Sequence, residues 1–165
     1  MATLSIKRTG ALVKTTSGRN PRIIGHLKEA NSQSFVVGDL VYVSSGAVTA
    51  CGADPSTILG IALKAATNTT TTNIVIPVLV LDGETSFSMS VYHGTAASAT
   101  LSDNTTQLSS AYGIVKSAAG KWCVDLSETS STRVEIMDYP VQGEALGDIY
   151  MQVMCKVLAA NRQAS

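Results

Sequence analysis

The chain has 165 residues, of which 45% are apolar and only 15% charged, and its twelve basic and twelve acidic side chains balance. This length suits one domain that buries its own core, so the fold does not require disulfides or metals. So few charges, against an ordinary share of about 25%, are typical of β-proteins that pack against many neighbours and less typical of cytoplasmic enzymes. The longest apolar run, residues 74–81, is too short to span a bilayer. The first ten residues lack the apolar stretch of a signal peptide, so we expect synthesis in a host cytoplasm and no membrane partner.

Residues 1–27 are predicted to form an extended basic arm, because their apolar side chains follow no helical period and Gly10, Gly18 and Pro21 interrupt them. Residues 1–28 hold six of the twelve bases and no acid, so an acidic partner is expected. The bases stand singly or in one pair without aromatic rings between them, which favours a protein surface over nucleic acid. The candidate contact residues of this arm are Leu4, Ile6, Lys7, Arg8, Leu12, Lys14, Arg19 and Arg22.

Residues 28–165 are predicted to form a single β-domain, whose first half alternates apolar runs with turn signals. Gly60 lies inside one such run and indicates a bulge or a close backbone approach. Residues 67–73, rich in Thr and Asn, are expected to form an exposed hairpin tip, and Asp82-Gly83 is a strong turn signal. The strands expected in this half are residues 40–43, 47–51, 58–63, 74–81 and 85–91, and a first short strand is expected before them at residues 23–25.

The second half begins with small polar residues at 94–106, which predict a long loop. Residues 148–158 are compatible with helix or strand, and apolar side chains at every second position from Ile149 to Val157 favour a strand. Residues 159–165 are expected to be frayed. Further strands are expected at residues 112–116, 121–126 and 132–139. In all, about nine short strands predict an all-β fold, a small β-barrel or sandwich with an extended N-terminal arm.

Cysteine and histidine residues show no metal-binding or disulfide pattern. The three cysteines, Cys51, Cys123 and Cys155, are widely spaced and form no C-x-x-C pair, so we expect buried, reduced thiols without a ligand role. Neither His26 nor His93 has a His, Cys or carboxylate neighbour at metal-ligand spacing, and both are expected to be structural or surface residues.

Other residues that could carry chemistry have simpler interpretations. Asp82 and Glu84 could form a glycosidase pair, but the D-G-E sequence is first of all a turn. Trp122, the one tryptophan, is expected in the core, with an interface role as the alternative. The sequence carries no nucleophile elbow, phosphate-binding loop or dinucleotide-binding fingerprint. We therefore predict no catalytic, cofactor-binding or metal-binding residues, and no enzymatic activity.

One part of the chain resembles a known family. Phe35-Val-Val-Gly-Asp-Leu-Val-Tyr-Val is followed by Gly46-Ala-Val-Thr-Ala and then by Ile58-Leu-Gly-Ile-Ala-Leu-Lys. These stretches resemble the opening of the small β-barrel in the decoration, or cement, proteins of tailed bacteriophage capsids, over roughly residues 35–95. The resemblance implies a virion protein on the capsid surface that binds the major capsid protein, stabilises the shell and is often a trimer. It assigns no role to any single residue.

Two alternatives to a capsid decoration protein remain. The first is another structural subunit of a virion, such as a tail-tube, connector or head-fibre-base protein, which would form rings or stacks. The second is a β-sandwich binding or adhesion module, which would need a signal sequence and exposed aromatic side chains.

Overall fold

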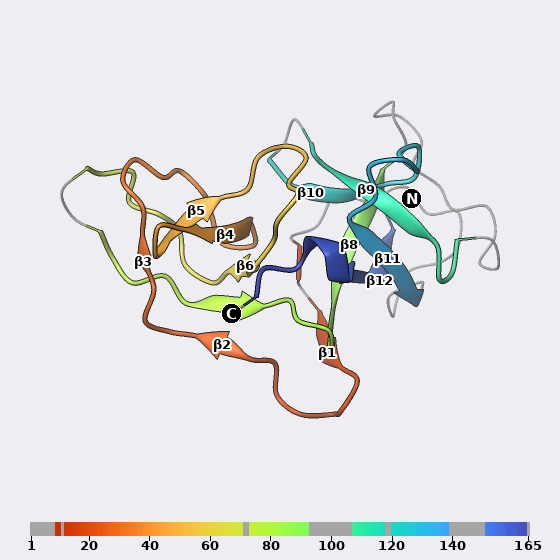
Figure 1. Ribbon diagram of the computed structural model, residues 1–165. Coiled ribbons are helices and arrows are strands. Elements are labelled where there is room, and N and C mark those ends of the chain that lie inside the picture. Colours follow the sequence, from red (N-terminus) through yellow and green to blue (C-terminus); the bar gives the residue numbers. More distant parts are fainter. Residues whose placement is uncertain are drawn as a thin grey trace, which may run out of the picture.

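The computed structural model describes residues 9–10, 12–70, 73–92, 107–117, 120–138 and 151–164. Within these residues the chain is all-β, as predicted, with twelve strands in two six-stranded sheets and one short 3-10 turn, η1 (Ala159–Asn161) (Figure 1). The first sheet lies to the right in Figure 1 and the second sheet to the left. No helix in this part of the chain is long and apolar enough to cross a membrane.

Five strands of the first sheet close into a barrel, because the last of them pairs back to the first. The long strand β8 takes part in three pairings, with β10 in parallel and with β12 and β1 in antiparallel fashion. Its apolar residues Phe87, Met89 and Val91 are fully buried, which confirms the strand expected at 85–91. In sheet order the strands are β1 (Val13–Thr15), β8 (Thr85–Tyr92), β10 (Trp122–Asp125), β9 (Ala111–Lys116), β11 (Val134–Asp138) and β12 (Gln152–Val157).

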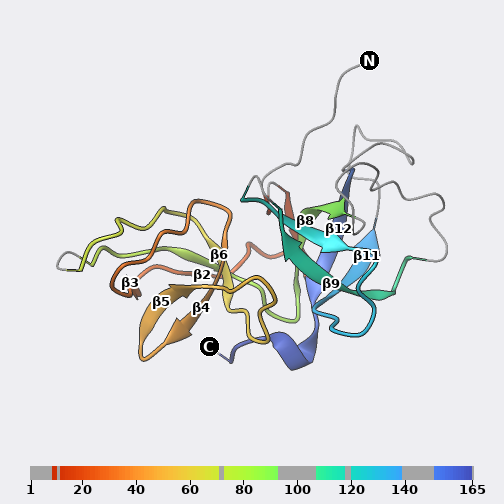
Figure 2. The same ribbon diagram turned by 90° about the horizontal axis from the view of Figure 1, so that it is seen from above.

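The second sheet consists of shorter strands and lies beside the barrel in both views (Figures 1 and 2). An isolated bridge from Lys28 to Val75 connects its last strand to the segment that precedes β7. Residues 22–29 therefore border both ends of the sheet, pairing with 74–80 and with β5. In sheet order the strands are β2 (Ile23–Ile24), β7 (Val78–Val80), β6 (Gly60–Ala62), β4 (Leu40–Ser44), β5 (Ala47–Ala50) and β3 (Lys28–Glu29).

The second sheet has buried side chains on both of its faces. One face contributes Leu40, Ile61, Leu79 and Leu81 to the same core cluster that fills the barrel, so the two sheets share one core. Alternate residues form a smaller cluster, the inner core, which consists of Phe35, Val41, Val48, Leu59, Ala62, Ile76, Val78 and Val80. Period-two alternation thus sends successive side chains of one strand into two different cores.

Gly60 on β6 lies directly against the backbone of the neighbouring strand β7. A Cβ built at this position would lie 2.0 Å from the backbone oxygen of Leu79, a distance that no side chain tolerates. The close approach predicted for Gly60 is therefore confirmed, and it allows β6 and β7 to pair.

Part of the N-terminal segment belongs to the two sheets. β1 pairs with β8, and β2 pairs with β7, although residues 1–27 were expected to form a separate arm. Neither β1 nor β3 was predicted. β3 consists of two charged residues, which are not typical of strands, and β1 spans only three residues, whereas β2 was expected at 23–25 from its two isoleucines. The attachment role of residues 1–27 remains a prediction.

The C-terminal tail is ordered, so the prediction of a frayed end at 159–165 is wrong for the described residues 159–164. Arg162 forms a parallel bridge with Ile58, and the amide of Gln163 donates to the Ile58 carbonyl oxygen at 2.9 Å. Asn161 is buried, and its side-chain amide donates to the carbonyl oxygen of Ser56 at 3.0 Å. The tail thus connects the end of the barrel to the second sheet, beside which the C-terminus lies in both views.

Two more expectations for the second half can be compared with the structure. The strand favoured over helix at 148–158 is confirmed by β12, which covers Gln152–Val157. Trp122 is 1% exposed and lies in the barrel core, as expected. The long loop predicted at 94–106 lies outside the described residues, as do the ends of the expected strands at 139 and 148–150.

Candidate assembly surface

The predicted contact residues of the N-terminal segment fall into two groups. Lys14, Arg19 and Arg22 are exposed, and Leu12 is half-buried against β8, where its backbone amide donates to the Ser88 hydroxyl at 2.9 Å. The described bases of this segment therefore reach solvent from β1, from the loop 16–21 and from the residue before β2. Leu4, Ile6, Lys7 and Arg8 lie outside the described residues.

Glu29 is a buried carboxylate that holds a loop. It is 1% exposed and accepts hydrogen bonds from the Thr67 amide at 2.8 Å, from the Thr67 hydroxyl and from the Ile74 amide at 3.3 Å. Burial alone would raise the pKa of Glu29, but these hydrogen bonds, aided by the positive charge of Lys64, bring it below its ordinary value. The polar tip expected at 67–73 is exposed where described, apart from the half-buried Thr69, and Glu29 anchors its base.

Asp39 is the second buried carboxylate, and it connects the two sheets. Its Oδ2 accepts a hydrogen bond from the Val36 amide at 3.0 Å, and it forms an ion pair with the Lys116 Nζ, also at 3.0 Å. The same ammonium group lies 5.6 Å from the centroid of the Trp122 ring. Lys116 therefore connects β9 and the barrel core to the loop that leads into β4.

Three further carboxylates cap their own turns. Asp82 Oδ1 accepts from the Glu84 amide at 3.0 Å and from the amide and hydroxyl of Thr85 at 3.0 and 2.8 Å. These bonds lower the pKa of Asp82, although burial acts in the opposite direction. The turn interpretation of D-G-E is thereby confirmed, and a carboxylate held ionised in this way is a poor general acid.

In the turn that follows β10, carboxylates likewise accept hydrogen bonds from nearby backbone amides and hydroxyls. Asp125 accepts from the amide and hydroxyl of Ser127, and Glu128 accepts from Ser130 and Ser131. The hydroxyl of Ser130, followed by the two backbone amides, lowers the pKa of Glu128 to about 2. These acids serve local backbone structure.

The three cysteines are free and buried. Burial raises the pKa of Cys51 to about 12, with the Asp39 carboxylate adding to it and Lys116 opposing it. Burial likewise raises the pKa of Cys123 to about 12, aided by Asp125, and that of Cys155 still further. Such thiols are protonated and unreactive at neutral pH. The described residues contain no group of three or more His, Cys, Asp or Glu that could hold a metal ion; His26 is exposed, and His93 lies outside them.

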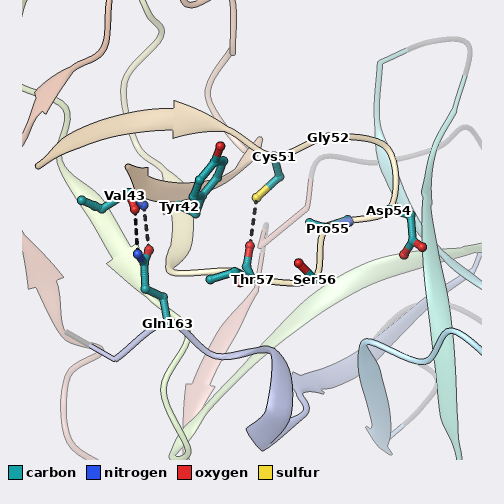
Figure 3. Close-up of a pocket in the computed structure, with 9 residues that line it drawn as sticks. All are labelled: Tyr42, Val43, Cys51, Gly52, Asp54, Pro55, Ser56, Thr57 and Gln163. Atoms are coloured by element: carbon teal, nitrogen blue, oxygen red, sulfur yellow. Dashed lines mark hydrogen bonds between the residues drawn. The ribbon is translucent and has the colours of Figure 1, made fainter. Parts of the chain in front are cut away.

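A hollow of about 470 Å³ lies between the 51–57 loop and the C-terminal tail (Figure 3). On one side the Gln163 side chain pairs with the backbone of Val43, accepting from its amide and donating to its carbonyl oxygen, both at 2.7 Å. The carboxylate of Asp54, the one acid of the hollow, pairs with Arg133 at 3.0 Å. Among its lining residues there is no histidine and no free carboxylate, so this hollow provides neither a general base nor a metal site.

Exposed apolar side chains indicate a candidate binding surface more clearly than the hollows do. Within the described residues six large apolar side chains are exposed, two on the barrel and four on the second sheet. Their exposed fractions are 55% for Ile23, 49% for Val36, 37% for Leu63, 39% for Val75, 44% for Leu108 and 40% for Met137. Sequence reasoning did not predict this surface, because an apolar residue in a strand gives no indication of whether its face is covered.

Comparisons with protein-family models, with curated proteins and with solved structures found no match. The geometry and the sequence therefore carry the functional argument.

Proposed function

We propose that this chain is a structural virion protein that binds the outside of an assembled major-capsid lattice and stabilises the shell without catalysis. Its copies are proposed to associate as a homo-oligomer, with a trimer favoured by the family resemblance. The observation that carries the proposal is the charge of the N-terminal segment. Residues 12–28 contain four bases, all exposed, and no acid: Lys14, Arg19, Arg22 and Lys28.

The chemistry of the described residues agrees with a binding role. Their buried acids and turn acids accept hydrogen bonds from the chain itself, and their thiols are buried and protonated. A protein that binds a lattice needs a rigid scaffold and an exposed surface complementary to its partner, and it needs no reactive group.

Pairing of β1 and β2 with the sheets also favours attachment through this segment. Ordering a free chain costs about 1–2 kcal/mol per backbone residue, which a few exposed charges cannot offset. Because residues 13–15 and 23–24 are already paired in the unbound protein, binding through Lys14 and Arg22 does not incur that cost. Stabilisation of the shell then follows by mass action, since the protein binds the assembled lattice and not its separated subunits.

The experiment measures binding to shells assembled from the major capsid protein of the same virus without this chain. Lys14→Glu combined with Arg19→Glu should weaken binding by about tenfold or more at low salt, and the difference should shrink as salt rises. Lys14→Arg combined with Arg19→Lys, which keeps both positive charges, is the matched control and should bind as the wild type does. Deletion of residues 1–22 is a poorer test, because it removes β1 and uncovers β8.

Two outcomes would contradict the proposal. If the wild-type chain does not bind the shells, or binds them without raising their melting temperature, the decoration role is wrong. If the purified chain forms rings or stacks by electron microscopy, the tail-tube or connector alternative is favoured. Sedimentation analysis of the free and shell-bound chain tests the trimer.

A further inference from the structure

We infer that the outer side of the second sheet is the face that contacts the shell, through an apolar stripe that fits an acidic protein surface. The stripe consists of Ile23, Val36, Leu63 and Val75, and Lys28 and Lys64 flank it. This inference rests on the proposed function and names the surface that serves it.

Alternation along the chain places the four stripe residues on one side of the sheet. Each is the immediate sequence neighbour of a side chain packed in or against the inner core: Ile24, Phe35, Ala62, and Ile74 with Ile76. Because successive side chains of an extended segment point in opposite directions, the stripe residues point away from the inner core. The side chain of Lys28 lies on the same side, since Lys28 is the register partner of Val75.

Backbone hydrogen bonds place the stripe residues on neighbouring segments. The Gly38 amide donates to the Ala62 carbonyl oxygen at 2.9 Å, and the Ala66 amide donates to that of Phe35 at 3.0 Å. Residues 36–37 therefore lie opposite residues 63–65.

The next segments continue this order. The Leu63 amide donates to the Pro77 carbonyl oxygen at 2.9 Å, and the Ile76 amide donates to that of Leu27 at 2.9 Å. Four segments far apart in sequence thus lie side by side, in the order of the segments that carry Val36, Leu63, Val75 and Ile23, and Ile23 stands further along its segment, opposite Leu79.

Part of this side is already covered, because Leu79 and Ile61 pack into the core shared with the barrel. Ile23 pairs in register with Leu79, so it borders that covered area. The stripe is the uncovered continuation of a face that the barrel covers only in part. An apolar face that is left partly uncovered in this way is typical of a protein–protein contact site.

Charge specifies the partner. The segments that carry the stripe have two acids, Glu29 and Asp39, which are 1% and 3% exposed and bonded within the chain. Their bases, Arg22, Lys28 and Lys64, are all exposed. The face therefore presents apolar side chains and positive charge with no exposed acid, which fits a partner surface that has carboxylates around an apolar patch. The segments that carry the stripe are residues 22–30, 35–39, 60–66 and 73–80.

A second copy of the chain related by a twofold axis fits this face poorly. A twofold contact would bring the patch against itself and so place Lys28 and Lys64 of one copy near the same lysines of the other. Like charges brought together in this way oppose association. The shell subunit is accordingly the occupant that the charges favour.

The test compares stripe residues with an exposed apolar residue of the barrel. Ile23→Ser with Val75→Ser should weaken binding to undecorated shells by about tenfold or more, because apolar contacts at the centre of an interface carry most of its affinity. Leu108→Ser alters a side chain of comparable exposure on the barrel and should leave binding unchanged. Val36→Ser, in a loop outside the strands, is the second stripe variant and tests the same face if the double variant folds poorly.

A charge pair completes the test. Lys28→Glu should weaken binding and reduce its salt dependence, whereas Lys28→Arg, which keeps the charge, should do neither. The inference is overturned if wild-type protein binds shells and the stripe variants bind equally well, a result that leaves the proposed function standing. It is also overturned if the barrel variant is the one that loses binding, or if a stripe variant dissociates the free protein into monomers, which would identify a second copy as the occupant. If the wild-type protein does not bind the shells, both the proposed function and this inference are wrong.

Discussion

The barrel and the second sheet are all-β structures of similar strand number, yet different interactions stabilise them. The barrel closes through strands of four to eight residues, and its core contains the one tryptophan together with long apolar side chains. The second sheet has strands of two to five residues and an inner core of smaller side chains. It also contains both nearly fully buried carboxylates, Glu29 and Asp39.

This difference shows how a small sheet can be kept ordered beside a larger one. Short strands contribute few ladder hydrogen bonds, so the second sheet depends on contacts from outside its own ladder: the barrel core, the ion pair to Lys116 and the C-terminal tail. A sheet supported in this way can leave its outer side uncovered. Among the residues that the structure describes, two exposed large apolar side chains lie on the barrel, Leu108 and Met137.

The largest expected effect separates the two cores. Trp122→Ala should destabilise the whole chain by about 3–5 kcal/mol, because the residue is fully buried in the core that both sheets share. Phe35→Ala should instead loosen the inner core while the barrel remains folded. Denaturant unfolding with Trp122 fluorescence reports the barrel in the Phe35 variant, and hydrogen exchange at 40–50 reports the second sheet. A single shared midpoint for both signals would show that the two parts unfold as one unit.

A smaller effect tests the polar anchors of the second sheet. Glu29→Ala should cost about 1–3 kcal/mol, because the amides of Thr67 and Ile74 lose their acceptor in a buried place. Glu29→Gln keeps one acceptor oxygen and should cost less. Hydrogen exchange should accelerate at 66–70 and 73–75 in the Ala variant and remain near wild type at 85–92. Equal acceleration in the barrel would mean that Glu29 supports the whole fold.

The smallest expected effect is on pH dependence. The pKa of Glu29 is lower in the folded protein than its ordinary value of 4.5, so its stabilising contribution is complete above that value and is lost as pH falls toward the folded pKa. Glu29→Gln should therefore show a shallower loss of stability below pH 4.5 than the wild type does. Asp82 and Glu128 shift in the same direction and should preserve part of the slope. Identical acid profiles for variant and wild type in thermal unfolding would contradict this role of Glu29.

Local patterns in the sequence were sufficient for several features of the fold. The alternation at 85–91 and 148–158 identified β8 and β12, the D-G-E sequence identified the turn at Asp82, and Gly60 indicated a close backbone approach. Each of these features depends on residues that are neighbours in the chain, so the sequence displays their physical cause directly.

The candidate surface could be predicted only in part. The basic character of residues 1–28 was visible in composition, but the stripe was not. Ile23, Val36, Leu63 and Val75 come from four separate segments and look like ordinary strand residues. Their exposure depends on how far the barrel covers the second sheet, and that is a matter of packing between distant parts of the chain.

The sequence by itself determined that this protein is all-β, where its longer strands and tight turns lie, and that its N-terminal segment is basic. The tertiary structure alone decided that β12 closes the barrel on β8, that β1 joins the first sheet, that the C-terminal tail bridges to Ile58, and that Glu29 is buried. The physical reason is the range of the interactions. Alternation and turn chemistry act between adjacent residues, whereas β1 meets β8 across about seventy residues and the tail meets Ile58 across about a hundred, where no local pattern specifies the partner.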